Sequence, residues 1–230
     1  MRGLFNLVVV AASALVASAS AQATTCPPAD YRSKAVFNPA KYFDGRWYAI
    51  QQIPVTYQPE NELFCVTADY TIETTKLCQL FRCNETVVRV DNGANKDSVT
   101  GTRKTAGLNG LIKDLSKPAE ASVGPRFLPS LFYGPYWVIE AGSYDELLAD
   151  NTEFTSENYE WAIITVGAPE VKTSGGCLPG TGAFNGEGFW LFSRKAVVSQ
   201  DITDRLVKLA ASKGLDVTAL KIVPQEGCKY

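Results

Sequence analysis

The most informative absence in this 230-residue chain is histidine, which does not occur at all. Without an imidazole, neither a Ser-His-Asp triad nor a Cys-His pair can form, so the common nucleophilic hydrolase mechanisms are excluded. The six cysteines include no Cys-x-x-Cys pair, which argues against a zinc site because such sites use closely spaced Cys and His ligands. We therefore expect no catalytic residue, no metal and no cofactor.

Clustered positive charge and long apolar runs are also missing from most of the chain. Its 22 Lys and Arg residues are scattered among 24 Asp and Glu residues, for a net charge of −2. Nucleic acids and anionic membranes bind clustered cations, so we expect neither as a partner. No apolar run after residue 21 is long enough to span a bilayer, which predicts that the protein is not an integral membrane protein.

The one long apolar stretch lies at the N-terminus and has the pattern of a secretory signal peptide. Arg2 supplies positive charge, residues 4–16 are mostly apolar, and Ala19-Ser20-Ala21 offers small residues for cleavage. A membrane anchor is the alternative, but the run is short and no charged residue follows it directly. We expect residues 1–21 to be a signal peptide and residues 22–230 to form a single extracellular domain.

Cysteine and asparagine residues carry two further predictions for a secreted chain. An even number of cysteines in an oxidising compartment predicts disulfides, here three, whose pairing the spacing alone does not decide. Asn84-Glu85-Thr86 is a sequon in a polar segment, so Asn84 is predicted to be glycosylated. The cysteines are Cys26, Cys65, Cys78, Cys83, Cys177 and Cys228.

Short alternating segments separated by turn residues indicate a β-sandwich or a β-barrel of about eight strands. Two glycine- and proline-rich stretches, 106–135 and 170–187, are predicted to be long loops, apart from one short strand near 119–123. A helical turn is predicted from Asn38-Pro39 to Tyr42. The other predicted strands are 45–54, 64–74, 76–90 with a tight hairpin around Cys78 and Cys83, 99–105, 136–141, 159–166 and 189–193.

One amphipathic helix is predicted after the last of these strands. Ser199 or Asp201 can cap its start, Lys213 lies in its last turn, and Gly214 can terminate it. A short strand over 219–223 follows. The apolar side chains that fall on one face of this helix are Ile202, Leu206, Leu209 and Ala210.

Three local patterns occur in an informative order along the chain. Gly45-Arg46-Trp47 opens the first strand, Asn158-Tyr159 precedes a late strand, and Arg194 follows the last strand before the helix. In order and spacing the chain resembles the lipocalin family, and most closely its apolipoprotein D-like branch. The family has a Gly-x-Trp start, an Asp-Tyr element and a final Arg, so Asn158 in place of Asp is a departure, conservative for a turn residue.

The resemblance implies an all-β fold, an eight-stranded antiparallel up-and-down barrel with a C-terminal α-helix packed outside. It implies that Trp47 fills the closed end of the barrel beneath the guanidinium group of Arg194, while Gly45 allows the tight turn into the strand. It also implies disulfides from Cys65 to Cys228 and from Cys26 to Cys177. Cys78 and Cys83 are then paired by exclusion and by their short separation.

The resemblance implies that the barrel binds and transports a small hydrophobic ligand, such as a retinoid, sterol, fatty acid or pigment, and is not an enzyme. A secreted interaction protein that binds a receptor or other protein through the two long loops is one alternative. A lipocalin-type enzyme acting on a lipophilic substrate is the other. Such an enzyme would use Cys65 as a nucleophile, or Asp69 and Glu73 as acids inside the barrel.

The alternation of side chains along each strand gives candidates for the ligand-contacting wall. We favour Tyr70, Trp137 and Trp161, because aromatic rings offer large rigid contact areas. The pattern does not decide which face of 136–139 or of 161–164 points inward, and the aromatic residues could equally be ordinary core. The predicted ligand-binding residues are Ala49, Gln51, Val66, Ala68, Tyr70, Trp137, Ile139 and Trp161.

Overall fold

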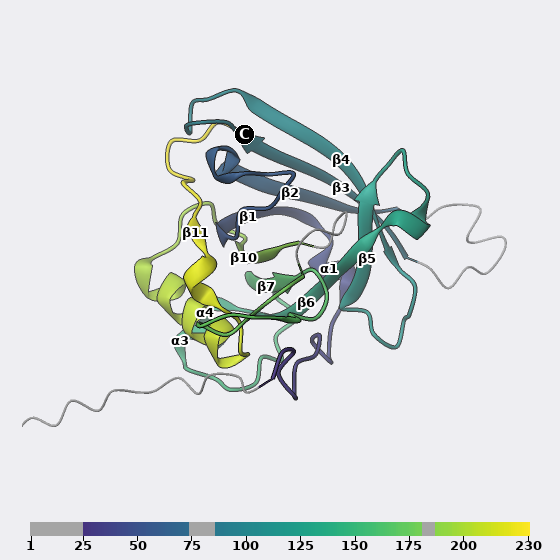
Figure 1. Ribbon diagram of the computed structural model, residues 1–230, viewed down its shortest axis with the longest axis vertical. Helices are drawn as coiled ribbons and strands as arrows, with labels where there is room; N and C mark the ends of the chain where they lie inside the picture. Colours follow the sequence, from purple (N-terminus) through teal and green to yellow (C-terminus); the bar gives the residue numbers. More distant parts are fainter. Residues whose placement is uncertain (1–24, 74–85, 181–186) are drawn as a thin grey trace, which may run out of the picture.

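A computed structural model describes residues 25–73, 86–180 and 187–230, and these form a closed antiparallel barrel (Figure 1). Each strand pairs with its neighbours in the order β10-β7-β6-β5-β4-β3-β2-β1, and β10 pairs with β1 to close the ring. The eight-stranded up-and-down barrel is therefore confirmed. Its strands are β1 (Gly45–Gln52), β2 (Phe64–Glu73), β3 (Thr86–Asn95), β4 (Arg103–Ile112), β5 (Glu120–Pro125), β6 (Gly134–Gly142), β7 (Trp161–Thr165) and β10 (Phe189–Ser193).

Helices lie outside the barrel or at its closed end. Helix α4 (Gln200–Ser212) packs beside α3 (Tyr144–Leu148) against the outer surface, as Figure 1 shows. Ser199 caps α4, since its hydroxyl accepts a hydrogen bond from the backbone N–H of Ile202, which confirms one of the two predicted caps. The smaller elements are α1 (Pro39–Tyr42), η1 (Glu60–Glu62), η2 (Ser130–Phe132), η3 (Val217–Ala219), β8 (Val171–Lys172), β9 (Cys177–Leu178) and β11 (Lys221–Ile222).

The buried apolar side chains form two separate clusters on the two sides of the barrel wall. The inner cluster fills the closed end and faces the interior, and it includes Trp47, Tyr70, Val90, Tyr136, Val138, Ile164 and Phe192. The outer cluster lies between the wall and helices α3 and α4, and it includes Ile50, Ile139, Trp161, Ile163, Leu191, Leu206 and Ala210. Alternate residues of one strand therefore serve two cores, as the period of a strand requires.

Half of the glycine-rich stretch 106–135 is strand: the short strand predicted near 119–123 is confirmed as β5, but the prediction of a loop is wrong for the end of β4 and the start of β6. Strand β4 continues to Ile112 instead of ending at 105, and β6 starts at Gly134. Large side chains from neighbouring segments lie over its glycines: an added Cβ on Gly107 would come within 2.9 Å of Arg126, and one on Gly124 within 2.3 Å of Tyr133. These glycines are strand positions that another side chain covers.

Other boundaries also differ from the predictions, and some predictions fall outside the described residues. Strand β3 runs to Asn95, beyond the predicted end at residue 90, and helix α3 was not predicted although Ser143 and Glu146 form a capping box at its start. Residues 1–21, the pair Cys78 and Cys83, and the sequon at Asn84 lie outside the described residues.

Two disulfides tie late segments of the chain to early ones. Cys26 bonds to Cys177, and Cys65 bonds to Cys228, across sequence separations of 151 and 163 residues. Both predicted pairings are confirmed. Because each bond closes a very long loop, each restricts the unfolded chain strongly, by about 2–5 kcal/mol in typical proteins.

The segment before Cys228 fills a gap in the barrel wall. Strands β1 and β2 pair only between residues 45–48 and 67–70. Beyond that point the side-chain amide of Gln225 donates to the carbonyl oxygens of Ala49 at 2.7 Å and Val66 at 2.9 Å. One buried amide thereby joins two strands that no longer bond each other. No helix in the described ranges is both long and apolar enough for a membrane span.

Candidate functional site

The closed end of the barrel is built around Trp47. Gly45 has a φ of +75°, a conformation that favours glycine, and it turns the chain into β1 so that Trp47 points inward. The guanidinium of Arg194 lies 3.9 Å from the centre of the Trp47 ring. Arg194 also donates to the carbonyl oxygens of Arg46 at 2.9 Å and Tyr42 at 3.0 Å, which confirms the predicted pairing of Trp47 with Arg194.

The Asn158-Tyr159 element supports the same end from outside the strands. Tyr159 is buried, and its hydroxyl accepts a hydrogen bond from the backbone N–H of Asn38 at 2.9 Å. Asn158 itself is exposed. This contact fixes the start of helix α1, which carries Tyr42 into the barrel.

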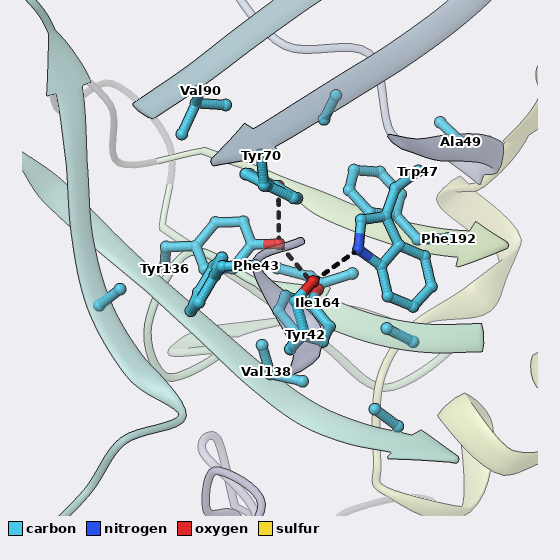
Figure 2. Close-up of a cluster of buried hydrophobic side chains, with 14 of the residues drawn as sticks. Tyr42, Phe43, Trp47, Ala49, Tyr70, Val90, Tyr136, Val138, Ile164 and Phe192 are labelled. Atoms are coloured by element: carbon cyan, nitrogen blue, oxygen red, sulfur yellow. Dashed lines mark hydrogen bonds between the residues drawn. The ribbon is translucent and has the colours of Figure 1, made fainter. Parts of the chain in front are cut away.

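Three tyrosines form the floor of the interior above Trp47, and Figure 2 shows their hydroxyls meeting. The hydroxyl of Tyr136 lies 2.9 Å from that of Tyr42 and 3.0 Å from that of Tyr70. Burial raises the pKa of all three hydroxyls well above the usual value of 10.0. The group therefore stays protonated and neutral at physiological pH.

Proton counting shows that this tyrosine floor has a spare hydrogen-bond donor. Each hydroxyl carries one proton, so three protons serve two hydroxyl–hydroxyl contacts. Whichever way the bonds run, one proton is left without an acceptor among the hydrogen bonds of the described residues. A molecule in the interior could accept a hydrogen bond there.

Four of the predicted wall residues lie in the inner cluster. Ala49, Val66, Ala68 and Tyr70 are all buried and come from the adjacent strands β1 and β2. Their alternate positions face the interior, apart from a register irregularity near the start of β2. They form one side of the interior.

The other four predicted wall residues point outward, so that part of the prediction is wrong. Ile139 and Trp161 belong to the outer cluster, and Trp137 packs against it. Gln51 pairs with Leu191, another member of the outer cluster, because β1 has a bulge between Ala49 and Gln51.

A bulge also shifts the strand period in β6, between Val138 and Glu140. Period-two alternation read from the sequence cannot place residues beyond such an insertion. The inner face instead carries Tyr136, Val138, Ala162 and Ile164. The tryptophans Trp137 and Trp161 belong instead to the layer between the wall and the outer helices.

Several inward-facing side chains keep accessible surface. Leu108 pairs with buried Val90, and Val123 pairs with Gly110 on the same face, yet both are only partly buried. Trp190 of β10 is likewise only partly buried against the inner cluster. Ala106, opposite Asn92, is exposed. Side chains on the inner face of a solidly packed barrel would be buried, so these residues offer apolar surface that the protein does not cover.

One inward-facing amide has a carbonyl oxygen without a partner. Gln52 is fully buried and pairs with Trp190 of β10 on the inner face. Its amide nitrogen donates to the side-chain oxygen of Gln58 at 3.1 Å, while its own oxygen has no hydrogen-bond partner. The Asn92 side-chain oxygen is also buried and unpaired, and Asn92 lies opposite inward-facing Ala68.

Buried charge, by contrast, lies outside the barrel wall. The two charged residues that are buried in the described part of the chain are Lys34 and Asp216. Lys34 forms an ion pair with Glu140 at 2.7 Å, and Glu140 also pairs with Lys213, the residue that follows helix α4. Asp216 accepts hydrogen bonds from Thr173 and Thr218. Among the residues that the structure describes, the buried polar side chains of the interior are therefore neutral.

The side chains considered for catalysis are engaged elsewhere. Cys65 is bonded to Cys228 and has no free thiol. Asp69 forms two hydrogen bonds with Arg46 at 2.7 and 2.8 Å, and Glu73 pairs with Arg89 at 2.8 Å. Both acids alternate with inward-facing Tyr70 and lie on the outer face. Among the described residues, no three Cys, Asp or Glu side chains gather into a group that could hold a metal ion.

Comparison with known proteins finds distant relatives that match most of the chain. Apolipoprotein D of Macaca fascicularis is 24% identical over 196 residues, covering 84% of this chain and 79% of that protein. Apolipoprotein D of Cavia porcellus is 23% identical over 233 residues, covering 98% and 97%. No protein-family model matches the chain.

Solved structures show a similar fold at low identity. Insecticyanin from the tobacco hornworm Manduca sexta has a TM-score of 0.54 and 14% identity, covering 89% of each chain. Apocrustacyanin C2 has a TM-score of 0.51 and 13% identity, covering 83% of this chain and 81% of that one. At these identities the structural likeness concerns the fold alone.

Proposed function

Since the chain belongs to the lipocalin family, as a distant relative of apolipoprotein D, we propose that it carries one small hydrophobic ligand inside its barrel. The ligand would lie above the tyrosine floor, between the inner faces of β1–β5 and β10. Retinoids, sterols, fatty acids and pigments are the classes that fit an apolar interior of this size class.

One observation carries this proposal: the inner wall is not fully packed. Leu108, Val123 and Trp190 face inward but keep accessible surface. Burying such apolar surface under a ligand is favourable by about 25 cal/mol per Å² before the costs of binding. The closed end beside Trp47 is filled, so the ligand would enter from the opposite end.

The test is a titration with retinol and with a long-chain fatty acid, followed by tryptophan fluorescence. Trp190 faces the interior, whereas Trp137 lies on the outer side. We expect saturable one-to-one quenching that is largely lost in Trp190→Phe. Trp137→Phe is the matched control and should keep the quenching signal.

Two results would contradict carriage. One is the absence of binding below about 10 μM, an affinity of roughly 7 kcal/mol, for every apolar ligand tried. The other is an interior found to be filled with side chains when the ligand-free protein is solved at high resolution.

We also propose that the protein is extracellular and that residues 1–21 are removed. The disulfides from Cys26 and Cys65 support this, because such bonds persist in oxidising compartments. N-terminal sequencing of secreted protein should begin near Gln22. An intact Met1 on a membrane-bound form would contradict the proposal.

A second candidate function, binding of a macromolecular partner through a loop, is favoured by the segment between β5 and β6. Phe127 is 83% exposed and Leu131 is 74% exposed, and both lie in this segment. Large apolar side chains gathered on one loop are typical of interaction sites. Replacing both with Ser should abolish capture of a protein partner while leaving ligand titration unchanged. Loss of ligand binding instead would assign the loop to carriage.

A further inference from the structure

The barrel interior holds a hydrogen-bond acceptor that the protein itself does not use, and we propose that the ligand is a neutral lipid whose hydroxyl group donates to Oε1 of Gln52. This inference rests on the proposed carrier function and narrows it to a chemical class. It assigns Gln52 as the residue that selects the polar group of the ligand.

Hydrogen bonds around Gln52 fix which end of its amide is free. The backbone oxygen of Glu62 can only accept, so the group that Gln58 presents to it, at 3.2 Å, must be its amide nitrogen. Gln58 therefore directs its side-chain oxygen toward Gln52. The amide nitrogen of Gln52 donates a hydrogen bond to that oxygen at 3.1 Å. The oxygen of Gln52 is left over, and it has no partner.

Gln52 lies where a ligand in the interior is nearer to its amide than bulk water is. Gln52 lies at the end of β1 away from Trp47, on the inner face, and is 0% exposed. Bulk water does not reach it, so leaving it unpaired is costly. Its neighbour across the strands is Trp190, which is only partly buried. In this proposal, a movement of the Trp190 side chain admits the hydroxyl group of the ligand to the Gln52 amide.

The chemistry of the remaining polar groups favours a neutral donor over an anion. The two unpaired buried side-chain atoms in the described residues are the oxygens of Gln52 and Asn92, both on the inner face. Oxygens of this kind bind hydroxyl or N–H groups and repel carboxylates. The buried cation Lys34 is paired with Glu140 outside the wall, so it is not available to a fatty-acid anion.

A competing arrangement uses the opposite end of the barrel. A carbonyl or carboxylate oxygen could accept the spare proton of the tyrosine floor, without using Gln52. The two arrangements predict different selectivity among ligands that share one skeleton but differ in the terminal group.

The experiment measures the affinities of the full chain for retinol, retinal and retinoic acid, with a long-chain fatty acid as a fourth probe. We expect retinol to bind about tenfold more tightly than retinal, the difference that one hydrogen bond to a buried acceptor commonly makes. Gln52→Leu should remove this preference, because it should weaken the binding of retinol and leave the affinities for the other probes unchanged. Gln51→Leu changes the adjacent glutamine, which faces outward, and should keep the preference.

Stability separates a ligand-binding role from a structural one. Gln52→Leu replaces an unpaired buried acceptor with an apolar group of similar size, so the melting temperature should stay the same or rise. If Gln52 instead held the loop in place through Gln58, Gln52→Leu would lower the melting temperature and would reduce the affinity for all three retinoids.

The possible failures are distinguishable. Retinal or retinoic acid binding as tightly as retinol to the unmodified protein would overturn the inference without any variant, and so would binding of the fatty acid alone. In either case carriage itself would stand. Absence of binding by all four probes would overturn carriage and the inference together.

Discussion

The two ends of the barrel differ in how completely their side chains are packed and hydrogen-bonded. At the closed end, Trp47 is fully buried, Arg194 covers its ring, and the backbone carbonyl groups nearby have donors. At the open end, Gln52 keeps an unpaired oxygen, and apolar side chains such as Phe127 remain exposed. Both ends are made from the same strands.

The residues that stabilise the fold therefore lie toward one end of the strands, and the residues that contact a ligand lie toward the other end. The backbone carbonyl groups beside Trp47 and Arg194 are paired within the protein, which fixes one arrangement of the chain there. Unpaired groups and open apolar surface toward the other end reduce stability and offer contacts to a ligand. Variants at matched positions of the two ends therefore test this separation.

The largest expected effect is at Trp47. Trp47→Ala removes a fully buried ring and should lower the free energy of unfolding by about 3–5 kcal/mol. Trp190→Ala, at a half-buried ring toward the open end, should cost less than half as much. Urea unfolding of both variants measures the difference. Equal losses would mean that the two ends are equally well packed.

Arg194→Ala comes next, with an expected loss of about 2–3 kcal/mol, because it removes the cation–π contact and the hydrogen bonds that Arg194 donates to the carbonyl oxygens of Arg46 and Tyr42. Lys104, whose ammonium pairs with Glu62 toward the open end, is largely exposed. Lys104→Ala should change stability by less than about 0.5 kcal/mol. A double-mutant cycle of Arg194 with Trp47 should show coupling, and strictly additive effects would contradict their contact.

Alkaline pH should destabilise the closed end through its tyrosines. Burial raises the pKa of Tyr42, Tyr70 and Tyr136 in the folded state above 10.0, near which they titrate when unfolded. Below pH 10 both states are protonated and the full stability is present. Above it the unfolded state loses protons first, so stability falls with rising pH by about 1.4 kcal/mol per pH unit for each tyrosine.

Tyr70→Phe tests this pH dependence. The variant should lose stability less steeply above pH 10 than the unmodified protein, by about 1.4 kcal/mol per pH unit. Chemical unfolding at a series of pH values, with tyrosinate absorbance as a second signal, measures both slopes. Identical slopes would show that Tyr70 titrates in the folded protein as it does in the unfolded chain.

The smallest expected effect is at the exposed loop. Phe127→Ser replaces a side chain that is 83% exposed, so the free energy of unfolding should change by less than about 0.5 kcal/mol. Thermal unfolding of Phe127→Ser and of Trp47→Ala, measured side by side, compares the loss of stability at the two ends. A loss above 1 kcal/mol would mean that the loop folds over the barrel in solution.

The closed end could be predicted from the sequence far better than the interior wall. Trp47 and Arg194 belong to short motifs with fixed roles, and Cys65 and Cys228 pair as the resemblance implies. The wall depends on which way alternate residues face, and one inserted residue reverses that assignment. The bulge after Ala49 moved Gln51 outward and Gln52 inward.

Two other errors came from reading residue types without their surroundings. Gly107 and Gly124 indicated a loop, yet each is a strand position covered by a large neighbour, Arg126 or Tyr133. Trp161 was favoured for the interior because of its size, but the layer beneath helix α4 requires large side chains as well. The signal for α3 was present, since Ser143 and Glu146 have the spacing of a capping box.

The amide of Gln225 sets an order of events during synthesis. Synthesis proceeds from the N-terminus to the C-terminus. Strands β1 and β2 therefore leave the ribosome long before Gln225, whose amide joins the ends where the two strands diverge. Until Gln225 and the closing strand β10 are available, a nascent chain exposes an unfinished sheet edge at β1. Such edges pair with other chains. The edge of β1, the strand that is made first, is therefore open to such pairing for the longest time.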